Sequence, residues 1–467
     1  MKNYQLSGWQ NKLIKIILTN DFFVSTFFFS NKFLKELSVS LMTYAFLKSQ
    51  WWSREDMESF QMQKICKLLS LAKTNVPFWQ NRLRDFMWIE KGKITLELFN
   101  EIPILQRNDL RMVSADIDHY INKDYKEDVK NNQNNIHRGK TSGSTSEPLV
   151  YFQNNVYEIN SLAIFRRFLV TIHKNKILPL LQVRQHDRRG VADKNIYKFF
   201  VLNCNQIKYK VDQLNLFSSG YPGEFILYSF ASYILEITSL VKKNILKIKP
   251  YAIISSGEAL THKQKEDIGE YLSVPIFNCY TSLEIGWMAN DCEYHNLHIN
   301  EDYVCIQVVN NDGKCLGYGE RGRIIVTAFN NTVMPFIRYD NGDVGILHNE
   351  PCTCGRTSRY LTLEGREAFV LHLPNNRKVP YIELIPILQE YSTVFKYHQV
   401  VQNTRNDITI NFVPESNQEV AEADLLEIAR RLRLLTDDTM HISFNKVDTI
   451  ESTPTGKQRV FKSFITN

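Results

Sequence analysis

A short hydroxyl-rich run, GKTSGSTSEP at residues 139–148, has residue types that could do chemistry. It follows the polar, Asn-rich residues 125–140, so the pattern predicts a loop. Such a loop offers backbone N–H groups and hydroxyl donors together, which is how loops hold phosphates. The spacing of a Walker A loop is absent, so the run is either a solvated loop or a phosphate-binding loop. The phosphate-binding residues would be Ser142, Gly143, Ser144 and Thr145.

The motif SSGEAL at residues 255–260 follows the apolar residues 251–254, which predict a strand. Gly257 at the end of a strand lets the backbone approach a flat ligand, and ligands of open α/β sheets gather at that end. An ordinary strand-to-helix turn, with Glu258 in the first helical turn, fits the same residues.

Two further motifs follow apolar runs. In YTSLEIG, Tyr280 could stack on a base, and Glu284 could hold a divalent cation that bridges phosphates, because hard cations prefer carboxylates. In RYDNGDVG, Asp343 follows a Gly on a tight turn, where it could accept hydrogen bonds from two vicinal ribose hydroxyls.

The chain ends on TPTGKQRVF, in which Pro454 and Gly456 force a turn that presents Lys457. A mobile lysine can neutralise the charge that develops between a carboxylate and an α-phosphate. Each motif alone is ambiguous, but their order and spacing along the chain narrow the interpretation.

Four residues have types and spacing that suit a metal. Cys292 and His298 lie six residues apart, and Cys352 and Cys354 form a C-x-C pair. Three thiolates and one imidazole make a closed tetrahedral zinc set, which would be structural rather than catalytic. Four buried side chains in unrelated turns are the alternative. His295 and Cys315 are nearby alternative ligands.

Composition places the chain among ordinary globular proteins. Its 467 residues predict two or more domains. The net charge is only +6, with 56 basic and 50 acidic residues mixed along the chain, which disfavours a nucleic-acid binder. Eight cysteines are few for this length, so we expect a reducing cytoplasm rather than a secreted disulfide scaffold. The oligomeric state stays open, and a homodimer is one option.

The N-terminal residues 14–33 are apolar and aromatic, but Asn20, Asp21, Asn31 and Lys32 interrupt or end the run. No uninterrupted span approaches the roughly 20 residues of a membrane helix, and no clear signal-peptide pattern is present. We expect amphipathic segments that pack on the body, with membrane contact at most peripheral.

The elements that must position these motifs predict an α/β fold. Residues 51–83 have helical spacing with a start signal at Ser53 and a stop at Pro77, and strands alternate with helices further on. We predict a large domain of mixed sheets and helices over residues 1–364, with a helical leader in 1–125. A small mobile α+β domain follows over residues 365–467.

At this point the chain resembles the adenylate-forming enzymes of the acyl-CoA synthetase type. Within them it is similar to the phenylacetate–CoA ligase branch, and most similar to the CapK-like proteins linked to capsular or extracellular polysaccharide clusters. The resemblance covers most of the chain. It rests on Q-x-x-x-I-C-K-L-L-S-L-A-K-T-N-V-P-F-W, TSGSTSEP, CEYHNLHINEDY, PCTCGR and GREAF.

The resemblance implies that a carboxylic acid reacts with ATP and Mg²⁺ to give acyl-AMP and pyrophosphate, after which an acceptor displaces AMP. The loop residues 142–145 would hold the β- and γ-phosphates, and Lys457 would be the adenylation lysine. Glu284 would engage Mg²⁺, and Asp343 and Arg366 would hold the ribose. The remaining nucleotide-binding residues would be Ser256, Gly257, Glu258, Tyr280 and Thr281.

Four departures from that pattern bear on the reaction: two concern the phosphate contacts, and two concern the second half-reaction. Glu147 stands where a basic residue is usual, Leu283 where a hydroxyl is usual, and Ala368 where a hinge Asp is usual. LHLPNNRKVP replaces the Gly-rich basic stretch that helps to position coenzyme A. The acceptor could therefore be coenzyme A, an amine, a hydroxyl or a sugar. A catalytically impaired nucleotide-binding scaffold is the alternative function.

Overall fold

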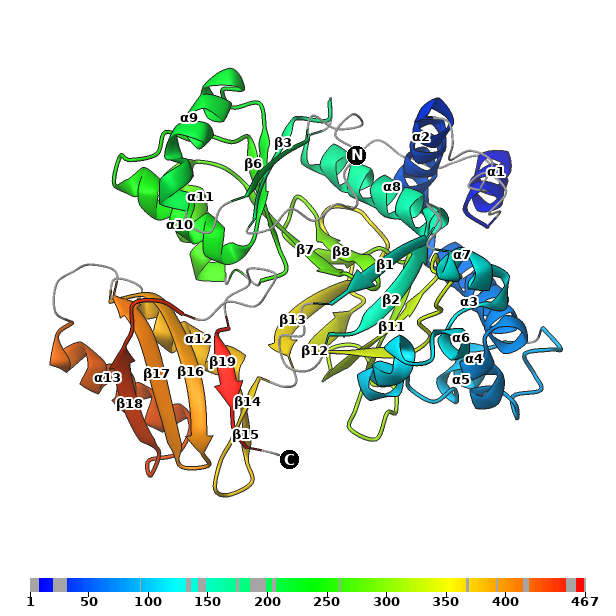
Figure 1. Ribbon diagram of the computed structural model, residues 1–467. Coiled ribbons are helices and arrows are strands. Elements are labelled where there is room, and N and C mark those ends of the chain that lie inside the picture. Colours follow the sequence, from blue (N-terminus) through cyan, green and yellow to red (C-terminus); the bar gives the residue numbers. More distant parts are fainter. Residues whose placement is uncertain are drawn as a thin grey trace. The chain divides into compact units, whose positions relative to one another are not determined.

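The computed structural model describes residues 8–19, 32–92, 94–131, 136–141, 148–173, 176–184, 199–203, 207–258, 260, 262–366, 369–391, 394–414, 420–450 and 459–465. The chain divides into two compact units (Figure 1). The larger holds most of residues 1–362, and the smaller holds Leu363–Asn467 together with Gly342–Gly345. Helices and strands alternate in both, so the predicted α/β class is confirmed.

The first part of the larger unit is helical. The predicted helix is α3 (Arg54–Asn75), and its cap is the Ser53 hydroxyl, which accepts a hydrogen bond from the Asp56 N–H. Pro77 does not simply end the helical run, because it opens α4 (Pro77–Arg82) at a position where no N–H is needed. The other elements are α1 (Gly8–Thr19), α2 (Lys32–Ser49), α5 (Leu96–Asn100), η3 (Arg107–Ser114), α6 (Ile117–Tyr120), η4 (Lys123–Tyr125) and α7 (Lys126–Lys130). In the described part of the chain, none of the helices combines the length and the apolar character that crossing a bilayer requires.

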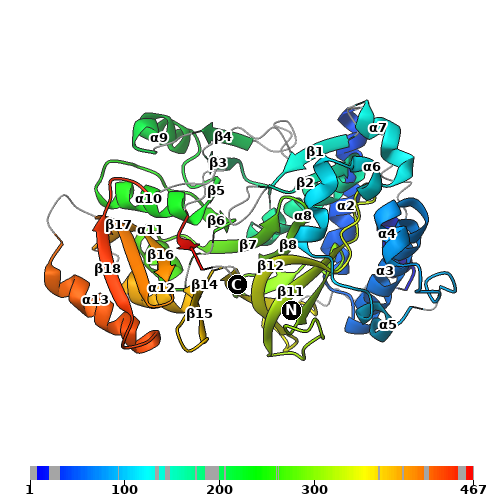
Figure 2. The ribbon, with the colours of Figure 1, turned by 60° about the horizontal axis from the view of Figure 1, so that its bottom comes forward.

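The described strands of the larger unit form a two-stranded hairpin, β1–β2, and an 11-stranded sheet in the order β10-β11-β12-β13-β9-β8-β7-β6-β5-β3-β4. Figure 2 shows part of this order, from β4 through β3, β5, β6 and β7 to β8. Strands β4, β3, β5, β6 and β7 run parallel, while β7, β8, β9 and β13 pair antiparallel. The strands are β1 (Ile136–Lys140), β2 (Val150–Asn154), β3 (Leu180–Arg184), β4 (Phe199–Asn203), β5 (Ile226–Ser229), β6 (Ala252–Ser256), β7 (Ile276–Ser282), β8 (Gly286–Asp291), β9 (Leu297–Ile299), β10 (Val304–Val309), β11 (Arg321–Ala328), β12 (Tyr339–His348) and β13 (Tyr360–Arg366).

Helices cover both faces of the parallel half of this sheet. Ile276 of β7 belongs to a buried cluster with residues of the helices on one face, whereas the next residue, Phe277, meets Phe168 of α8. Successive strand residues point to opposite faces, so α8 lies on the other side of the sheet. The helices are α8 (Asn155–Ile172), η5 (Ile207–Lys210), α9 (Val211–Gly220), α10 (Ala231–Lys242) and α11 (His262–Leu272).

The smaller unit has its own core. Its described four-stranded sheet has the order β18-β17-β16-β19, and α12 and α13 contribute Leu384, Leu388, Ile428 and Leu432 to the buried cluster. The elements are β14 (Val370–His372), β15 (Lys378–Pro380), α12 (Tyr381–Glu390), β16 (Phe395–Thr404), β17 (Asp407–Pro414), α13 (Glu422–Leu435), β18 (His441–Lys446) and β19 (Phe461–Ser463).

Candidate active site and metal centre

The ends of β6 and β7 bring two predicted motifs together. The strands are parallel neighbours with Ser256 opposite Cys279, so the residues that follow leave the same edge of the sheet. The Ser256 and Thr281 hydroxyl oxygens lie 3.2 Å apart. Gly257 has a φ of +75°, a conformation that favours glycine, and it lets the chain turn directly after the strand.

The side chain of Glu258 has a partner on another element. Its Oε2 accepts a hydrogen bond of 2.8 Å from the Ser232 N–H, in the first turn of α10. A carboxylate at this position satisfies an N–H that has no partner within the helix. The Glu258 carboxylate therefore ties β6 to α10.

Tyr280 is buried and fixed at its hydroxyl. Asn341 of β12 donates a hydrogen bond from Nδ2 to the Tyr280 hydroxyl oxygen, and both side chains are less than a tenth exposed. The amide therefore sets the orientation of the ring that is predicted to cover adenine. Asn341 lies in the RYDNGDVG motif, two residues before Asp343, but the sequence analysis did not single it out.

Glu284 lies in the tight turn between β7 and β8, and only 5% of it is exposed. The Tyr339 hydroxyl donates to its Oε1 over 3.3 Å. Gln153 of β2 donates from Nε2 to the carbonyl oxygens of Leu283 and Glu284, at 3.0 and 3.2 Å. Tyr339 of β12 therefore holds the carboxylate, and Gln153 of β2 holds the backbone of the turn that carries it, an arrangement suited to positioning a cation.

The same turn shows why its glycine is needed. Gly286 has a φ of +94°, and a Cβ there would lie 2.4 Å from the Tyr303 hydroxyl and 2.8 Å from that of Tyr157. Ser282, which could replace the hydroxyl missing at Leu283, accepts a 3.2 Å hydrogen bond from the Ile285 N–H. Its oxygen is therefore engaged within the turn.

Asp343 and Arg366, the predicted ribose-binding pair, lie on β12 and β13, in the short stretches of these two strands that group with the smaller unit. Arg366 Nε lies 3.1 Å from Asp343 Oδ1, so the guanidinium and the carboxylate form an ion pair. This ion pair holds the Asp343 carboxylate against the guanidinium of Arg366. The structure thus brings together two residues that are 23 positions apart in the sequence.

Several predicted residues lie outside the described part of the chain. These are Ser142, Gly143, Ser144, Thr145, Glu147, Ala368 and Lys457. The described residues that flank the predicted phosphate loop form the β1–β2 hairpin, which closes with a 2.9 Å hydrogen bond from the Thr141 N–H to the Leu149 carbonyl oxygen.

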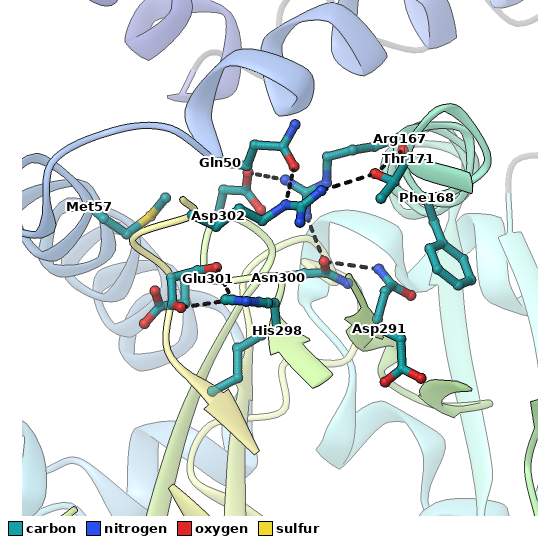
Figure 3. A pocket seen from close by; sticks show the side chains of 14 residues that line it. Gln50, Met57, Arg167, Phe168, Thr171, Asp291, His298, Asn300, Glu301 and Asp302 are labelled. Carbon is teal, nitrogen blue, oxygen red and sulfur yellow. Dashed lines mark hydrogen bonds and ion pairs between the residues drawn. The ribbon is translucent and has the colours of Figure 1, made fainter. Parts of the chain in front are cut away.

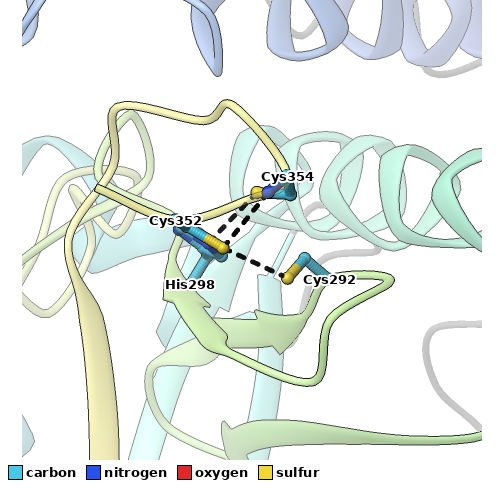
Figure 4. A group of neighbouring side chains, drawn as sticks. All are labelled: Cys292, His298, Cys352 and Cys354. Atoms are coloured by element: carbon cyan, nitrogen blue, oxygen red, sulfur yellow. Dashed lines mark hydrogen bonds between the residues drawn. The ribbon is translucent and has the colours of Figure 1, made fainter. Parts of the chain in front are cut away.

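The predicted metal ligands come together in the larger unit (Figure 4). The ligand atoms of Cys292, His298, Cys352 and Cys354 all lie within 4.8 Å of one another. The Sγ atoms of Cys292 and Cys352 are 3.7 Å apart, and Cys354 Sγ is 3.4 Å from His298 Nε2. For zinc bonds of about 2.3 Å to sulfur and 2.0–2.1 Å to nitrogen, a tetrahedron has edges of about 3.8 Å and 3.6 Å, so this donor set fits zinc.

Hydrogen bonds orient each donor in this cluster. His298 Nδ1 lies 2.8 Å from the Ser358 carbonyl oxygen, which leaves Nε2 for the thiols. Backbone N–H groups of Tyr294 and Arg356 donate to the sulfurs of Cys292 and Cys354, each over 3.4 Å. Hydrogen bonds with Cys292 and with His298 lower the pKa of Cys354, which favours the thiolate that binds metals.

The two alternative ligands lie elsewhere. His295 has a φ of +62°, and its ring lies 5.8 Å from that of Phe277. Cys315 Sγ accepts a hydrogen bond of 3.4 Å from Gln307. Neither belongs to the group of four.

A small polar pocket lies beside the cluster and includes its ligand His298 (Figure 3). Arg167 of α8 makes a 2.6 Å ion pair with Asp302 and a 2.6 Å hydrogen bond to Asn300. The Ser49 hydroxyl at the end of α2 also donates to Asp302. This network joins α2 and α8 to the strands that carry the cluster.

The fold and the strand-end site define the class of protein to which this chain is similar: the adenylate-forming ligases. Over 88% of this chain and 90% of the other, the structure matches 2-hydroxyisobutyryl-CoA ligase in the postadenylation state in complex with R3-HIB-AMP, with a TM-score of 0.72 and 16% identity. This likeness establishes the fold.

The sequence relatives are more specific. Protein CapK of Staphylococcus aureus is 24% identical over 434 residues, or 86% of this chain and 88% of the relative. Phenylacetate-coenzyme A ligase of Thermus thermophilus is 24% identical over 420 residues, or 82% of this chain and 88% of the relative. Residues 371–463 match the family model of the CapK C-terminal domain. The predicted resemblance is confirmed, and the predicted enzyme class, a ligase, is that of the phenylacetate-coenzyme A ligase relative.

Proposed function

We propose that the protein activates a carboxylic acid with ATP as an acyl-adenylate and then transfers the acyl group to an acceptor. The observation that carries the proposal is the grouping of the Ser256 and Thr281 hydroxyls with the buried Glu284 carboxylate at the carboxyl ends of two adjacent strands. Nucleotides bind at this edge of open α/β sheets. The fold is that of CoA ligases solved with acyl-AMP compounds.

In the first half-reaction, a carboxylate oxygen of the acid attacks the α-phosphorus of ATP. The new acyl O–P bond forms as the bond to pyrophosphate breaks. The Ser256 and Thr281 hydroxyls can donate hydrogen bonds to the nucleotide, and Asn341 holds Tyr280 so that the ring keeps one orientation. Fixed donors of this kind need no reorganisation during the reaction.

Glu284 is the residue proposed to hold Mg²⁺, which would reduce the negative charge that repels the incoming carboxylate. Tyr339 and Gln153 keep this carboxylate and its turn in place. Lys457 is proposed to bring its ammonium group to the α-phosphate, and Asp343 to accept from the ribose while paired with Arg366. Residues 142–145 are proposed to hold the terminal phosphates.

In the second half-reaction, the acceptor attacks the acyl carbonyl carbon and AMP leaves. Coenzyme A is the acceptor named for the phenylacetate-coenzyme A ligase relative. In this chain LHLPNNRKVP replaces the Gly-rich basic stretch that usually helps to position coenzyme A. The proposed acceptor is therefore coenzyme A, an amine, a hydroxyl or a sugar. A role in capsular or extracellular polysaccharide synthesis is part of the proposal, because the resemblance to CapK-like proteins implies it and the similarity to protein CapK supports that resemblance. The small number of cysteines favours the reducing cytoplasm as the location.

We assign the Cys292, His298, Cys352 and Cys354 group to one structural zinc ion. Four protein donors close the coordination shell, which leaves no position for a substrate. The ion would fix the turn at residues 352–358 against β8 and β9.

A nucleotide-binding scaffold without turnover is the second candidate. Leu283 is 37% exposed and lacks the usual hydroxyl, and the Ser282 oxygen already accepts the Ile285 N–H. A scaffold would bind AMP in calorimetry but would not release pyrophosphate.

The test is exchange of labelled pyrophosphate into ATP with pools of carboxylic acids. We expect exchange that depends on an acid in the pool and on Mg²⁺. AMP binding without exchange for any pool would favour the scaffold, and failure to bind adenine nucleotides would refute both candidates.

A further inference from the structure

Helix α2 has two apolar faces. One face packs on α8, where the Phe46 ring lies 5.6 Å from the Arg167 guanidinium. The other face is open to solvent although its residues are large and apolar. Its side chains recur at helical spacing and are 72, 44, 37 and 47% exposed: Phe33, Leu37, Leu41 and Tyr44.

Helix α1 packs beside α2 and exposes apolar side chains of its own. Leu13 and Ile16 of α1 are 45 and 43% exposed, whereas Ile14 and Leu18 on its other side are buried. Single exposed apolar side chains are normal on a protein surface, but a group of several neighbouring ones marks an interaction site. We call the six exposed side chains the α1–α2 face: Leu13, Ile16, Phe33, Leu37, Leu41 and Tyr44.

The charge around this face is basic. Residues 1–49 contain six lysines and two acidic residues, and two of the lysines, Lys15 and Lys35, form ion pairs with Asp56 and Glu158. Lys48 Nζ lies 5.6 Å from the Tyr44 ring at one end of the face, and Lys12 of α1 is exposed. The carboxylate of Glu36 on α2 is neutralised by an ion pair with Arg166 of α8.

We propose that the α1–α2 face lies on a membrane surface that contains anionic lipids. The two helices would lie in the plane of the interface, with their apolar side chains at the boundary between headgroups and acyl chains. The lysines around them would meet lipid phosphates, and polybasic segments are attracted to anionic leaflets in this way. A second copy of the chain fits less well, because a symmetric contact would bring two copies of the same basic surface together.

Flotation of the full-length protein with vesicles tests the proposal. Phosphatidylserine–phosphatidylcholine vesicles should carry the protein, while pure phosphatidylcholine vesicles should carry much less. Salt should weaken the binding because it screens the lysines. Equal flotation with both vesicle types, or none with either, would overturn the proposal.

The test variant carries Phe33→Ser and Leu37→Ser, both on the α1–α2 face. The control variant carries Leu216→Ser and Leu434→Ser, at two leucines outside this face that are 76 and 68% exposed. The first pair should lower partitioning at least about tenfold, because each buried apolar side chain contributes strongly to insertion. The second pair should float like wild type. Thermal unfolding of both confirms that they fold.

Two results with these variants would count against a lipid surface. One is similar flotation of the two double variants. The other is a wild-type dimer, seen by analytical ultracentrifugation without lipid, that only the Phe33/Leu37 variant loses, since a second copy would then cover the face. Neither result bears on adenylation, which is measured separately by pyrophosphate exchange.

Discussion

Replacing one ligand of the cysteine cluster, by Cys354→Ala, should release zinc and loosen the turn at residues 352–358. With one donor removed, the remaining three cannot close a tetrahedral shell, and the turn loses its fixed link to His298. We expect wild-type protein to contain one zinc ion per chain and the variant to contain almost none.

The expected loss of stability follows from the hydrogen bonds that the turn makes with neighbouring helices. Arg356 donates to Gln50 over 3.0 Å and to Thr171 over 3.4 Å, while the Thr357 hydroxyl donates to the Trp52 carbonyl and its own carbonyl accepts from Arg54. These bonds connect the turn to α2, α3 and α8. At about 1 kcal/mol each, their loss would destabilise the larger unit by roughly 4 kcal/mol. That corresponds to a fall in Tm of roughly 5 °C for a unit of this size.

The assay combines mass-spectrometric zinc content with calorimetric unfolding. Cys315→Ala is the matched control, because Cys315 is a partly buried thiol outside the cluster. The control should keep its zinc. Full zinc content and an unchanged Tm in Cys354→Ala would refute the assignment, as would wild-type protein that takes up no zinc.

Three further predictions concern the site and the smaller unit. Glu284→Gln should lower pyrophosphate exchange about 10²-fold or more, because a positioned charge in a buried site is lost; exchange at the wild-type rate would exclude the proposed role. Tyr339→Phe should raise the Mg²⁺ concentration for half-maximal exchange about threefold to tenfold, since one hydrogen bond to that carboxylate is removed; an unchanged Mg²⁺ dependence would contradict it. Burial lowers the pKa of His398 to about 4, so the folded state resists its protonation and stability is lost as pH falls from about 6.5 towards 4. The shift corresponds to a loss of roughly 3 kcal/mol in the free energy of unfolding as an upper limit. The actual loss should be smaller, because the His398 ring is partly exposed to solvent. His398→Gln should flatten this pH dependence in denaturant unfolding, and identical profiles would argue against it.

The positions of the strand-end motifs could be predicted from the sequence because each apolar run stops at a clear local signal. Ser256 ends β6 and Ser282 ends β7, close to where the runs end. The partners of these motifs could not be predicted, because Gln153, Tyr339 and Asn341 come from strands distant in sequence. The order of strands in the 11-stranded sheet brings Tyr339 and Asn341 to these motifs, whereas Gln153 comes from the separate β1–β2 hairpin, which contacts the turn after β7.

The choice of metal ligands shows the same limit. Spacing left His295 and His298 as alternatives, and the pairing of β9 with β13 decides between them. His298 lies opposite Tyr360, close to the turn that carries the C-x-C pair, whereas His295 lies in the connection before β9. The bond from Glu258 to α10 is likewise tertiary, because its partner Ser232 is 26 residues away.

The most direct test of adenylation is to trap its product. The protein is incubated with ATP, Mg²⁺ and pools of carboxylic acids without any acceptor, then quenched and analysed by mass spectrometry. We predict one acyl-AMP species, in an amount near that of the protein, which disappears in Lys457→Ala. Unchanged ATP with every pool, or conversion of ATP to ADP, would contradict the proposed reaction.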